Sequence, residues 1–195
     1  MRGRQFRRNK RKLEELPAIS KAGLEIKVKN IVLIGFMGTG KSTVGRILAG
    51  KLNRRFIDTD KEIEKLTGIT VARLITNYGI IRFRSEETLL IKKLTQEENQ
   101  VIATGGGTLL NPENDRLLRQ NGIIICLTAS PEVIHNRVKR KKKERPLLAK
   151  GDLMEQIKIL TEERREIYQK ADFTADTGNG SLEATVKSII DFIKR

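Results

Sequence analysis

Cysteine and aromatic residues are scarce in this sequence. It contains one cysteine and no tryptophan, and aromatic residues make up only 4% of it. A disulfide framework is therefore excluded, which fits a reducing compartment, and we expect a cytoplasmic protein. The cysteine, Cys126, lies in an apolar run at residues 123–127, so we expect a buried and unreactive strand residue. The core must consist mainly of isoleucine, leucine and valine.

Long apolar runs and clusters of metal ligands are also missing. No stretch approaches the roughly 18 apolar residues that a membrane-spanning helix needs, so we expect no membrane span. The one histidine, His135, has no cysteine or acidic residue at metal-binding spacing. We therefore interpret His135 as structural and expect no zinc site.

Acidic residues are outnumbered, because 24 aspartates and glutamates stand against 39 lysines and arginines, a net charge of +15. Residues 1–29 hold ten basic and three acidic residues, a net of 10 − 3 = +7. We interpret residues 1–29 as a flexible basic extension ahead of one domain at residues 30–195. The charge fits an enzyme for anionic nucleotides and acids, with nonspecific nucleic-acid binding as the alternative. The scarcity of aromatic stacking residues disfavours that alternative.

From residue 30 onward, short apolar strand patterns alternate with helical periodicity. Strands are predicted at residues 31–34, 55–58, 100–104, 123–128 and 173–176. Helices are predicted at residues 43–52, 61–66, 70–77, 83–97, 112–120, 153–169 and 182–193, and another begins at Ser130. The fold class is therefore α/β, with a parallel sheet covered by helices on both faces.

The residues Gly35–Ser42 fit the phosphate-loop pattern G-x-x-x-x-G-K-[ST], between a predicted strand and a predicted helix. Glycines let the backbone close around an anion, and its N–H groups then point at phosphate oxygens. The start of the following helix adds unpaired N–H groups and a positive dipole end. Lys41 can reach the β- and γ-phosphates, and the Ser42 hydroxyl can bind Mg²⁺. The motif predicts binding of a nucleoside triphosphate.

Two further motifs follow predicted strands, at the end of the sheet where α/β proteins bind ligands. In Asp58-Thr59-Asp60, the carboxylates suit contact with Mg²⁺ through water and recognition of a hydroxyl group. The alternative is a turn in which Asp60 caps the next helix. The glycines of Gly105-Gly106-Gly107 allow close approach of a ligand to the backbone, and a plain flexible turn is the alternative.

Three arginines are candidate anion ligands. Arg84 shares a helix face with Glu87, which can orient it toward a carboxylate, although an ordinary surface ion pair is the alternative. Arg164 is a second candidate carboxylate ligand, with a solvated helix face as the alternative. Arg145 lies in a polar, basic loop at residues 139–151. Closure of that loop over a nucleotide would bring Arg145 to the γ-phosphate and exclude water.

Taken together, these residues resemble the shikimate kinase family over residues 30–195. The motifs in the family's order are Gly35–Ser42, Asp58-Thr59-Asp60, Phe83-Arg84 with Glu87, Gly105-Gly106-Gly107, Arg145-Pro146-Leu147-Leu148, and Arg164 four residues before Tyr168. Many unrelated NTPases share the phosphate loop, whereas the Asp-Thr-Asp, triple-glycine and Arg-Pro-Leu-Leu set is specific to this family.

The resemblance implies the three-layer P-loop kinase fold of the nucleoside monophosphate kinases. It implies a five-stranded parallel sheet in the order 2-3-1-4-5 and a mobile lid at about residues 139–152. The implied activity is transfer of the γ-phosphoryl group of ATP to the 3-hydroxyl of shikimate, with Mg²⁺. ATP and shikimate are the expected partners, and a monomer is expected.

The resemblance also implies a role for each candidate residue. Shikimate is held by Asp60, Arg84, Gly105, Gly106, Gly107 and Arg164, with the two arginines on its carboxylate. ATP is bound by Gly38, Thr39, Gly40, Lys41, Ser42, Thr43 and Arg145, with Arg137 or Arg140 at the adenine. Mg²⁺ is bound by Ser42 and by Asp58 through water, and the catalytic residues are Lys41, Asp60 and Arg145.

Two positions depart from the family pattern. Ile80 stands where a glutamate is common, and Glu166 stands where a proline is common. We expect the first change to remove one local contact without altering the role of Arg84, and the second to alter only its helix. A gluconate kinase-like enzyme of the same fold and a non-catalytic homologue that acts as a binding module are the alternatives.

Overall fold

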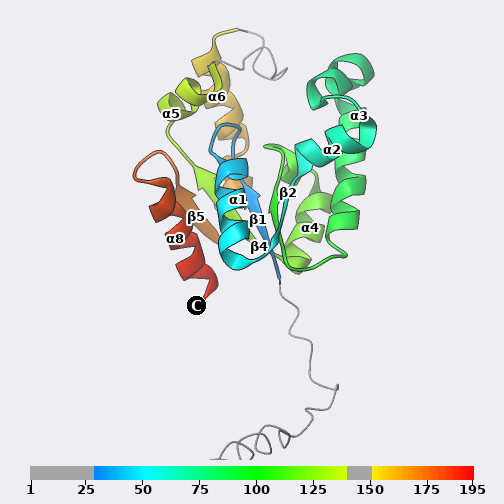
Figure 1. Ribbon diagram of the computed structural model, residues 1–195. Coiled ribbons are helices and arrows are strands. Elements are labelled where there is room, and N and C mark those ends of the chain that lie inside the picture. The colour runs from blue at the N-terminus through cyan, green and yellow to red at the C-terminus, as the bar shows by residue number, and fades with distance from the viewer. Residues whose placement is uncertain (1–28, 140–150) are drawn as a thin grey trace, which may run out of the picture.

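A single parallel sheet organises the computed structural model, which describes residues 29–139 and 151–195 (Figure 1). Its five strands lie in the order β2-β3-β1-β4-β5, which confirms the predicted order. The strands are β1 (Asn30–Ile34), β2 (Arg55–Asp58), β3 (Gln100–Ala103), β4 (Gly122–Thr128) and β5 (Phe173–Asp176). All neighbouring strands are paired in parallel, so their carboxyl ends lie along one edge.

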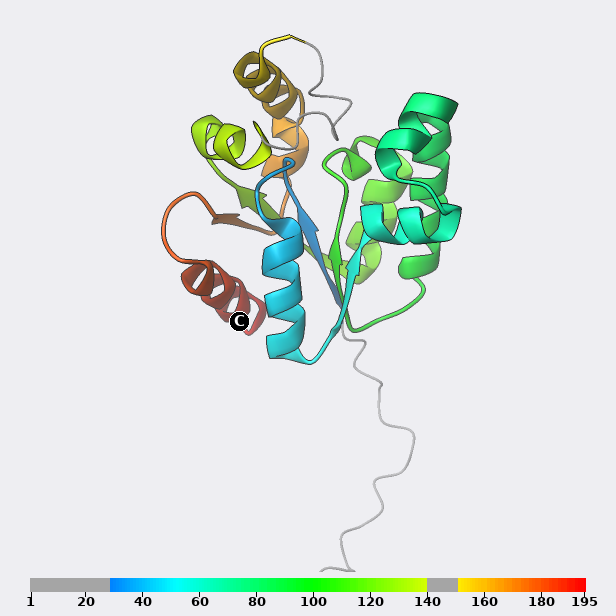
Figure 2. The same cartoon turned by 45° about the horizontal axis from the view of Figure 1, so that its top comes forward.

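Helices cover both faces of the sheet. Helices α1 (Lys41–Leu52) and α8 (Leu182–Ile193) pack on one face, whereas α3 (Val71–Leu94) and α4 (Pro112–Asn121) cover the other. Figure 2 shows this three-layer arrangement. Every residue of β1 and β3 is buried, because both of their faces are covered, and this explains their continuous apolar runs. Cys126 is 1% exposed, and burial raises the pKa of its thiol to about 11, which confirms a buried thiol.

Two helical arms rise beyond the carboxyl ends of the strands (Figure 1). One arm contains α2 (Thr59–Thr67) and the first part of α3. Gly79 has a φ of 84° and interrupts α3 between the helices predicted at residues 70–77 and 83–97, which confirms a break between them. The other arm contains α5 (Pro131–Val138), which Ser130 caps as predicted, and α6 (Leu153–Glu163). The two arms thus flank the edge where the candidate residues gather.

Some predicted boundaries were wrong. The helix predicted at residues 153–169 is two helices, α6 and α7 (Arg165–Gln169), because Arg164 between them adopts φ −102° and ψ 0°. The helix predicted to reach residue 97 ends at Leu94. A 3₁₀ helix at Thr108–Leu110 was not predicted. The predicted extension lies almost wholly outside the described residues, as does the lid segment 140–150 with Arg140 and Arg145. Within the described ranges, no helix has the length and apolarity needed to cross a membrane.

Candidate functional site

The phosphate loop connects β1 to α1 and depends on glycine at defined positions. Gly35, Gly38 and Gly40 have φ values of 130°, 84° and 92°, which L-residues with side chains rarely adopt. A Cβ at Gly35 would lie 2.2 Å from the backbone oxygen of Leu127. Lys41 Nζ donates hydrogen bonds to the carbonyl oxygens of Gly35 (2.8 Å) and Phe36 (2.9 Å), so the lysine spans the loop that it follows. The loop has the tight backbone and the helix start that triphosphate binding requires.

Ser42 and Asp58 are in direct contact at the mouth of this loop. Ser42 Oγ donates a hydrogen bond to Asp58 Oδ2 at 2.6 Å, and Asp58 Oδ1 accepts from the backbone N–H of Lys61 at 3.3 Å. Asp58, and not Asp60, therefore caps α2, which contradicts the alternative stated for Asp60. The paired hydroxyl and carboxylate oxygens fit Mg²⁺, which prefers oxygen ligands and keeps several waters. The described residues contain no cluster of three or more His, Cys, Asp or Glu that could bind a metal ion.

Asp60 lies in the first turn of α2, beside Asp58. Its Oδ1 atom is buried and has no hydrogen-bond partner among the residues that the structure describes. Burial, followed by the negative charges of Asp58 and Glu87, raises the pKa of the Asp60 carboxyl from 3.8 to about 6, although Lys41 opposes this shift. A carboxyl group with a raised pKa and an unpaired oxygen can accept a proton from a ligand hydroxyl near neutral pH.

Arg84 is held by a buried carboxylate. Its Nη1 lies 2.5 Å from Glu87 Oε2, and Glu87 is fully buried. The other oxygen of Glu87 accepts a hydrogen bond from Thr108 Oγ1 at 2.5 Å. The buried, hydrogen-bonded carboxylate of Glu87 holds Arg84 in place. This ion pair therefore differs from the ordinary surface ion pair that was the alternative. The guanidinium is free to bind a ligand through its remaining N–H groups.

Arg164 comes from the break between α6 and α7 and is 4% exposed, so it does not lie on a solvated helix face. Its Nη1 donates to the backbone oxygen of Gly106 at 3.0 Å, and the hydroxyl of Tyr168 donates to the same oxygen at 2.8 Å. The guanidinium carbon lies 5.5 Å from the ring centre of Phe36, a cation–π distance. Arg164 is therefore oriented by the glycine segment on one side and by the phosphate loop on the other.

The glycines of Gly105-Gly106-Gly107 provide space. A Cβ at Gly107 would lie 2.5 Å from Arg84 Nη2, and one at Gly105 would lie 3.0 Å from Asp60 Oδ1. A Cβ at Gly106 would lie 3.2 Å from Arg164 Nη1. None of the three has a φ in the left-handed region. Glycine thus leaves room for three side chains at this backbone, whereas the predicted close approach of a ligand stays a prediction.

Two adjoining cavities contain these residues. The phosphate-loop pocket, of about 630 Å³, is lined by residues 37–44 and by Asp58, Asp60, Thr104, Gly106, Arg137, Thr177, Gly180, Leu182 and Thr185. The arginine pocket, of about 510 Å³, is lined by Met37, Ser42, Asp58, Asp60, Lys61, Glu64, Thr70, Val71, Ala72, Ile75, Phe83, Arg84, residues 105–107 and Arg164. Both include Met37, Ser42, Asp58, Asp60 and Gly106, so they form one site with two compartments.

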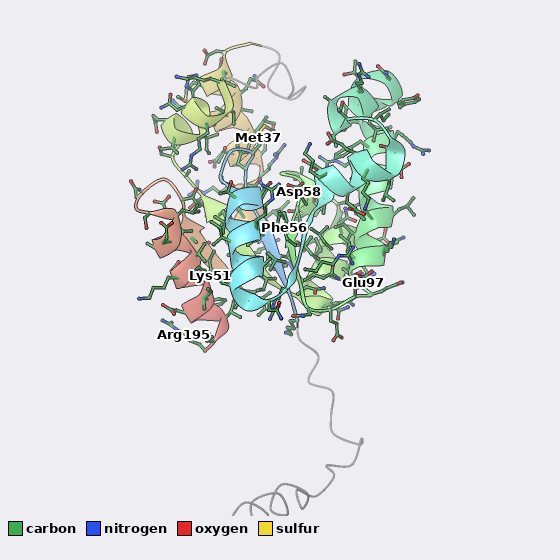
Figure 3. All side chains as sticks on the ribbon, viewed as in Figure 1. Met37, Lys51, Phe56, Asp58, Glu97 and Arg195 are labelled. Carbon is green, nitrogen blue, oxygen red and sulfur yellow. The ribbon has the colours of Figure 1, made fainter. Side chains whose placement is uncertain are left out.

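The candidate residues within the described ranges line one or both pockets. Gly38, Thr39, Gly40, Lys41, Thr43 and Arg137 line the phosphate-loop pocket. Figure 3 shows Met37 and Asp58 at the end of the sheet between the two arms, whereas Lys51, Glu97 and Arg195 lie at the opposite end. Arg145 lies outside the described residues, so its predicted role stays a prediction.

Sequence reasoning missed several residues that support this site. Thr108 holds Glu87, the Tyr168 hydroxyl contacts Gly106, and Phe36 faces Arg164. Thr177 lines the phosphate-loop pocket and contacts Arg137. One signal was available for Thr177, because it follows β5 at the carboxyl edge where ligands bind. Tyr168 was noted only for its spacing from Arg164, and no sequence pattern indicates the contacts of Thr108 and Phe36.

The comparisons with known proteins agree on one family. A family model described as shikimate kinase matches residues 37–194. A shikimate kinase of Pelotomaculum thermopropionicum is 62% identical over 86% of this chain and 96% of its own length. A shikimate kinase of Desulforudis audaxviator is 53% identical over 86% of this chain and 87% of its own length.

Solved structures give the same result. The shikimate kinase from Acinetobacter baumannii in complex with shikimate has a TM-score of 0.82 and 36% identity, covering 86% of this chain and 93% of that one. A gluconokinase from Sinorhizobium meliloti has a TM-score of 0.57 and 18% identity, covering 86% and 92%, and shares the fold alone. The chain belongs to the shikimate kinase family.

Proposed function

We propose that this protein transfers the γ-phosphoryl group of ATP to the 3-hydroxyl of shikimate, which yields shikimate 3-phosphate and ADP. Membership of the family supports the proposal. The observation that carries it is the unpaired Oδ1 of Asp60, which lies where the phosphate-loop pocket meets the arginine pocket. The acceptor hydroxyl and the γ-phosphate must meet at that junction, so the general base that accepts the hydroxyl proton must lie there.

The phosphate-loop pocket binds the donor. Residues 38–43 and the Lys41 ammonium line this pocket and are the proposed phosphate ligands. Arg137 lines it too and is, with Arg140, a candidate for contact with the adenine. Ser42 and Asp58 are the residues that would bind Mg²⁺, Asp58 through water. When bound, Mg²⁺ neutralises charge on the phosphate oxygens.

The arginine pocket binds the acceptor. Arg84 and Arg164 bind the carboxylate of shikimate, because planar guanidinium groups match carboxylates. Asp60 orients the 3-hydroxyl and accepts its proton while the new oxygen–phosphorus bond forms and the bond from the γ-phosphorus to the β–γ bridging oxygen breaks. Arg145, which is not among the described residues, is the proposed residue that stabilises the transferring group. Catalysis thus rests mainly on positioning and charge neutralisation.

A coupled assay with ATP and a panel of acceptors tests the proposal. We expect ADP release with shikimate and none with gluconate. Phosphorylation of gluconate in place of shikimate would favour the gluconate kinase-like alternative. Binding of both ligands without turnover would favour a binding module, and a rise in melting temperature with each ligand would reveal that binding.

We also propose that the enzyme is a cytoplasmic monomer and that residues 30–195 suffice for activity. Analytical ultracentrifugation measures whether the protein is a monomer, and a truncated protein with an initiating methionine followed by residues 30–195 tests whether these residues suffice. We expect the truncation to leave kcat/KM for shikimate within about twofold. If affinity for DNA falls steeply with salt and is lost in the truncated protein, the extension binds nucleic acid instead.

A further inference from the structure

Thr177, which directly follows β5, contacts the phosphate loop across 138 positions of sequence. Its Oγ1 lies 2.8 Å from the backbone oxygen of Thr39 and 3.0 Å from that of Thr128. The backbone N–H of Thr177 already donates to the Thr128 oxygen at 2.8 Å. A hydroxyl group has one proton to donate, and we assign it to the shorter hydrogen bond, the one to the backbone oxygen of Thr39.

Arg137 completes the junction. Its Nη1 donates to Thr177 Oγ1 at 3.1 Å and to the backbone oxygen of Gly38 at 3.2 Å, and its Nη2 donates to the backbone oxygen of Thr177 at 2.6 Å. The hydroxyl of Thr177 therefore accepts from Arg137 and donates to Thr39. Two successive carbonyl groups of the phosphate loop, those of Gly38 and Thr39, are held from outside the loop.

The bond to Thr39 determines where the next N–H group points. In a planar trans peptide, the C=O and N–H bonds point in opposite directions. Holding the Thr39 oxygen toward Thr177 thus directs the Gly40 N–H away from Thr177, toward the space that the loop encloses. Gly40 has a φ of 92°, and a Cβ there would meet no atom within 4 Å. Glycine has no side chain to limit rotation of this peptide, so the hydrogen bond from Thr177 can determine its orientation.

We propose that Thr177 is a positioning residue for phosphate binding, which acts by fixing the orientation of the Thr39–Gly40 peptide. The proposal deepens the proposed function, on which its kinetic test rests, because the same loop presents ATP for transfer. Without the Thr177 hydroxyl, the Thr39–Gly40 peptide can rotate. The Gly40 N–H group then no longer points at the phosphate and cannot donate a hydrogen bond to it. This type of preorganised backbone donor stabilises charge without rearrangement during binding or reaction.

The test compares Thr177→Val, which lacks the hydroxyl, with Thr177→Ser, which keeps it. Thr174→Val is the matched control, because Thr174 lies exposed on β5, the strand that Thr177 follows. By calorimetry, we expect Thr177→Val to weaken ADP binding about tenfold, with Thr177→Ser and Thr174→Val within about twofold of the wild type. AMP binding, measured by competition, should change less than about twofold, because AMP lacks the β-phosphate. If Thr177→Val does not fold, Thr177→Ala replaces it.

In the kinetic assay, Thr177→Val should lower kcat/KM for ATP about tenfold and leave the KM for shikimate within about twofold. Equal ADP affinity of Thr177→Val and wild type would overturn the proposal, as would an equal loss in Thr177→Ser. Equal weakening of AMP and ADP would overturn it too, because Thr177 would then act on the nucleoside. If the wild type phosphorylates no shikimate, the proposed function fails, while ADP binding still decides the role of Thr177.

Discussion

The two pockets of this site are built by different means. The phosphate-loop pocket is lined mainly by one continuous segment, residues 37–44, which runs into α1 and supplies backbone groups. The arginine pocket takes its polar groups from side chains of separate segments, namely Asp60, Arg84 with Glu87, and Arg164, around the backbone of residues 105–107. The first pocket should therefore be sensitive to changes in backbone conformation, and the second to changes in individual side chains.

The largest effect is expected at Asp60, where the two pockets meet. Asp60→Asn keeps the shape of the side chain but cannot accept a proton. We expect kcat to fall by about 10² to 10⁴-fold, with little change in ADP affinity. Steady-state kinetics and calorimetry measure both quantities. A variant that retains more than about a tenth of wild-type kcat would show that Asp60 is not the base.

The second largest effect is expected when the buried charge of Glu87 is removed. Glu87→Gln leaves Arg84 without its carboxylate partner, and we expect a loss of about 3 kcal/mol in unfolding free energy together with a raised KM for shikimate. The control is Glu86→Gln, because Glu86 pairs with Arg82, whose side chain is 62% exposed. That control should cost less than about 1 kcal/mol. Urea denaturation measures both, and equal losses would contradict the structural role of Glu87.

The substitution Arg164→Lys tests whether the two pockets bind their ligands independently. Lysine keeps the charge but cannot present two parallel donors to a carboxylate, so we expect the KM for shikimate to rise about 10- to 100-fold. The KM for ATP should stay within about twofold. Arg165→Lys is the control, because the neighbouring Arg165 side chain is 62% exposed and pairs with Glu162 at the surface. A comparable rise in both KM values would mean that the pockets are not separable.

The raised pKa of Asp60 predicts that its charge destabilises the ligand-free fold. In the native state the pKa is about 6, against 3.8 for an unperturbed carboxyl. Between these values the native state binds more protons than the unfolded state, so the Asp60 contribution to stability falls as pH rises from about 4 to 6. We therefore expect Asp60→Asn to be more stable than wild type by about 3 kcal/mol at pH 7.5, and less so at pH 4.5. Urea denaturation at the two pH values measures this, and an equal difference at both would contradict it.

The smallest effect is expected at Phe36, which tests whether the phosphate loop supports the acceptor. Phe36→Leu removes the ring beside the Arg164 guanidinium. We expect the KM for shikimate to rise about threefold to tenfold, with the KM for ATP within about twofold. Equal changes in the two KM values would instead point to a general disturbance of the loop.

Much of the fold was predictable, because each strand has a short apolar run. The phosphate loop was predictable too, because its glycines mark positions where the backbone needs conformations that other residues rarely adopt. The break at Arg164 was not predictable, since the helical periodicity continues from residue 153 to residue 169 across it. A capping role was the alternative for Asp60, but Asp58 has that role, because α2 begins at Thr59 and Asp60 lies in its first turn. Local sequence patterns report local conformation, whereas the contacts of Thr177 and Tyr168 depend on chain segments far apart in sequence.

The backbone oxygen of Gly106 has a consequence for the choice of ligand analogues. A carbonyl oxygen has two lone pairs, and Arg164 and Tyr168 each donate a hydrogen bond to this one. A ligand therefore finds this acceptor already occupied. An analogue with an amino group in place of a hydroxyl near Gly106 would bring extra hydrogens and meet no free acceptor there. Inhibitors that approach this backbone should carry oxygen lone pairs and no N–H groups.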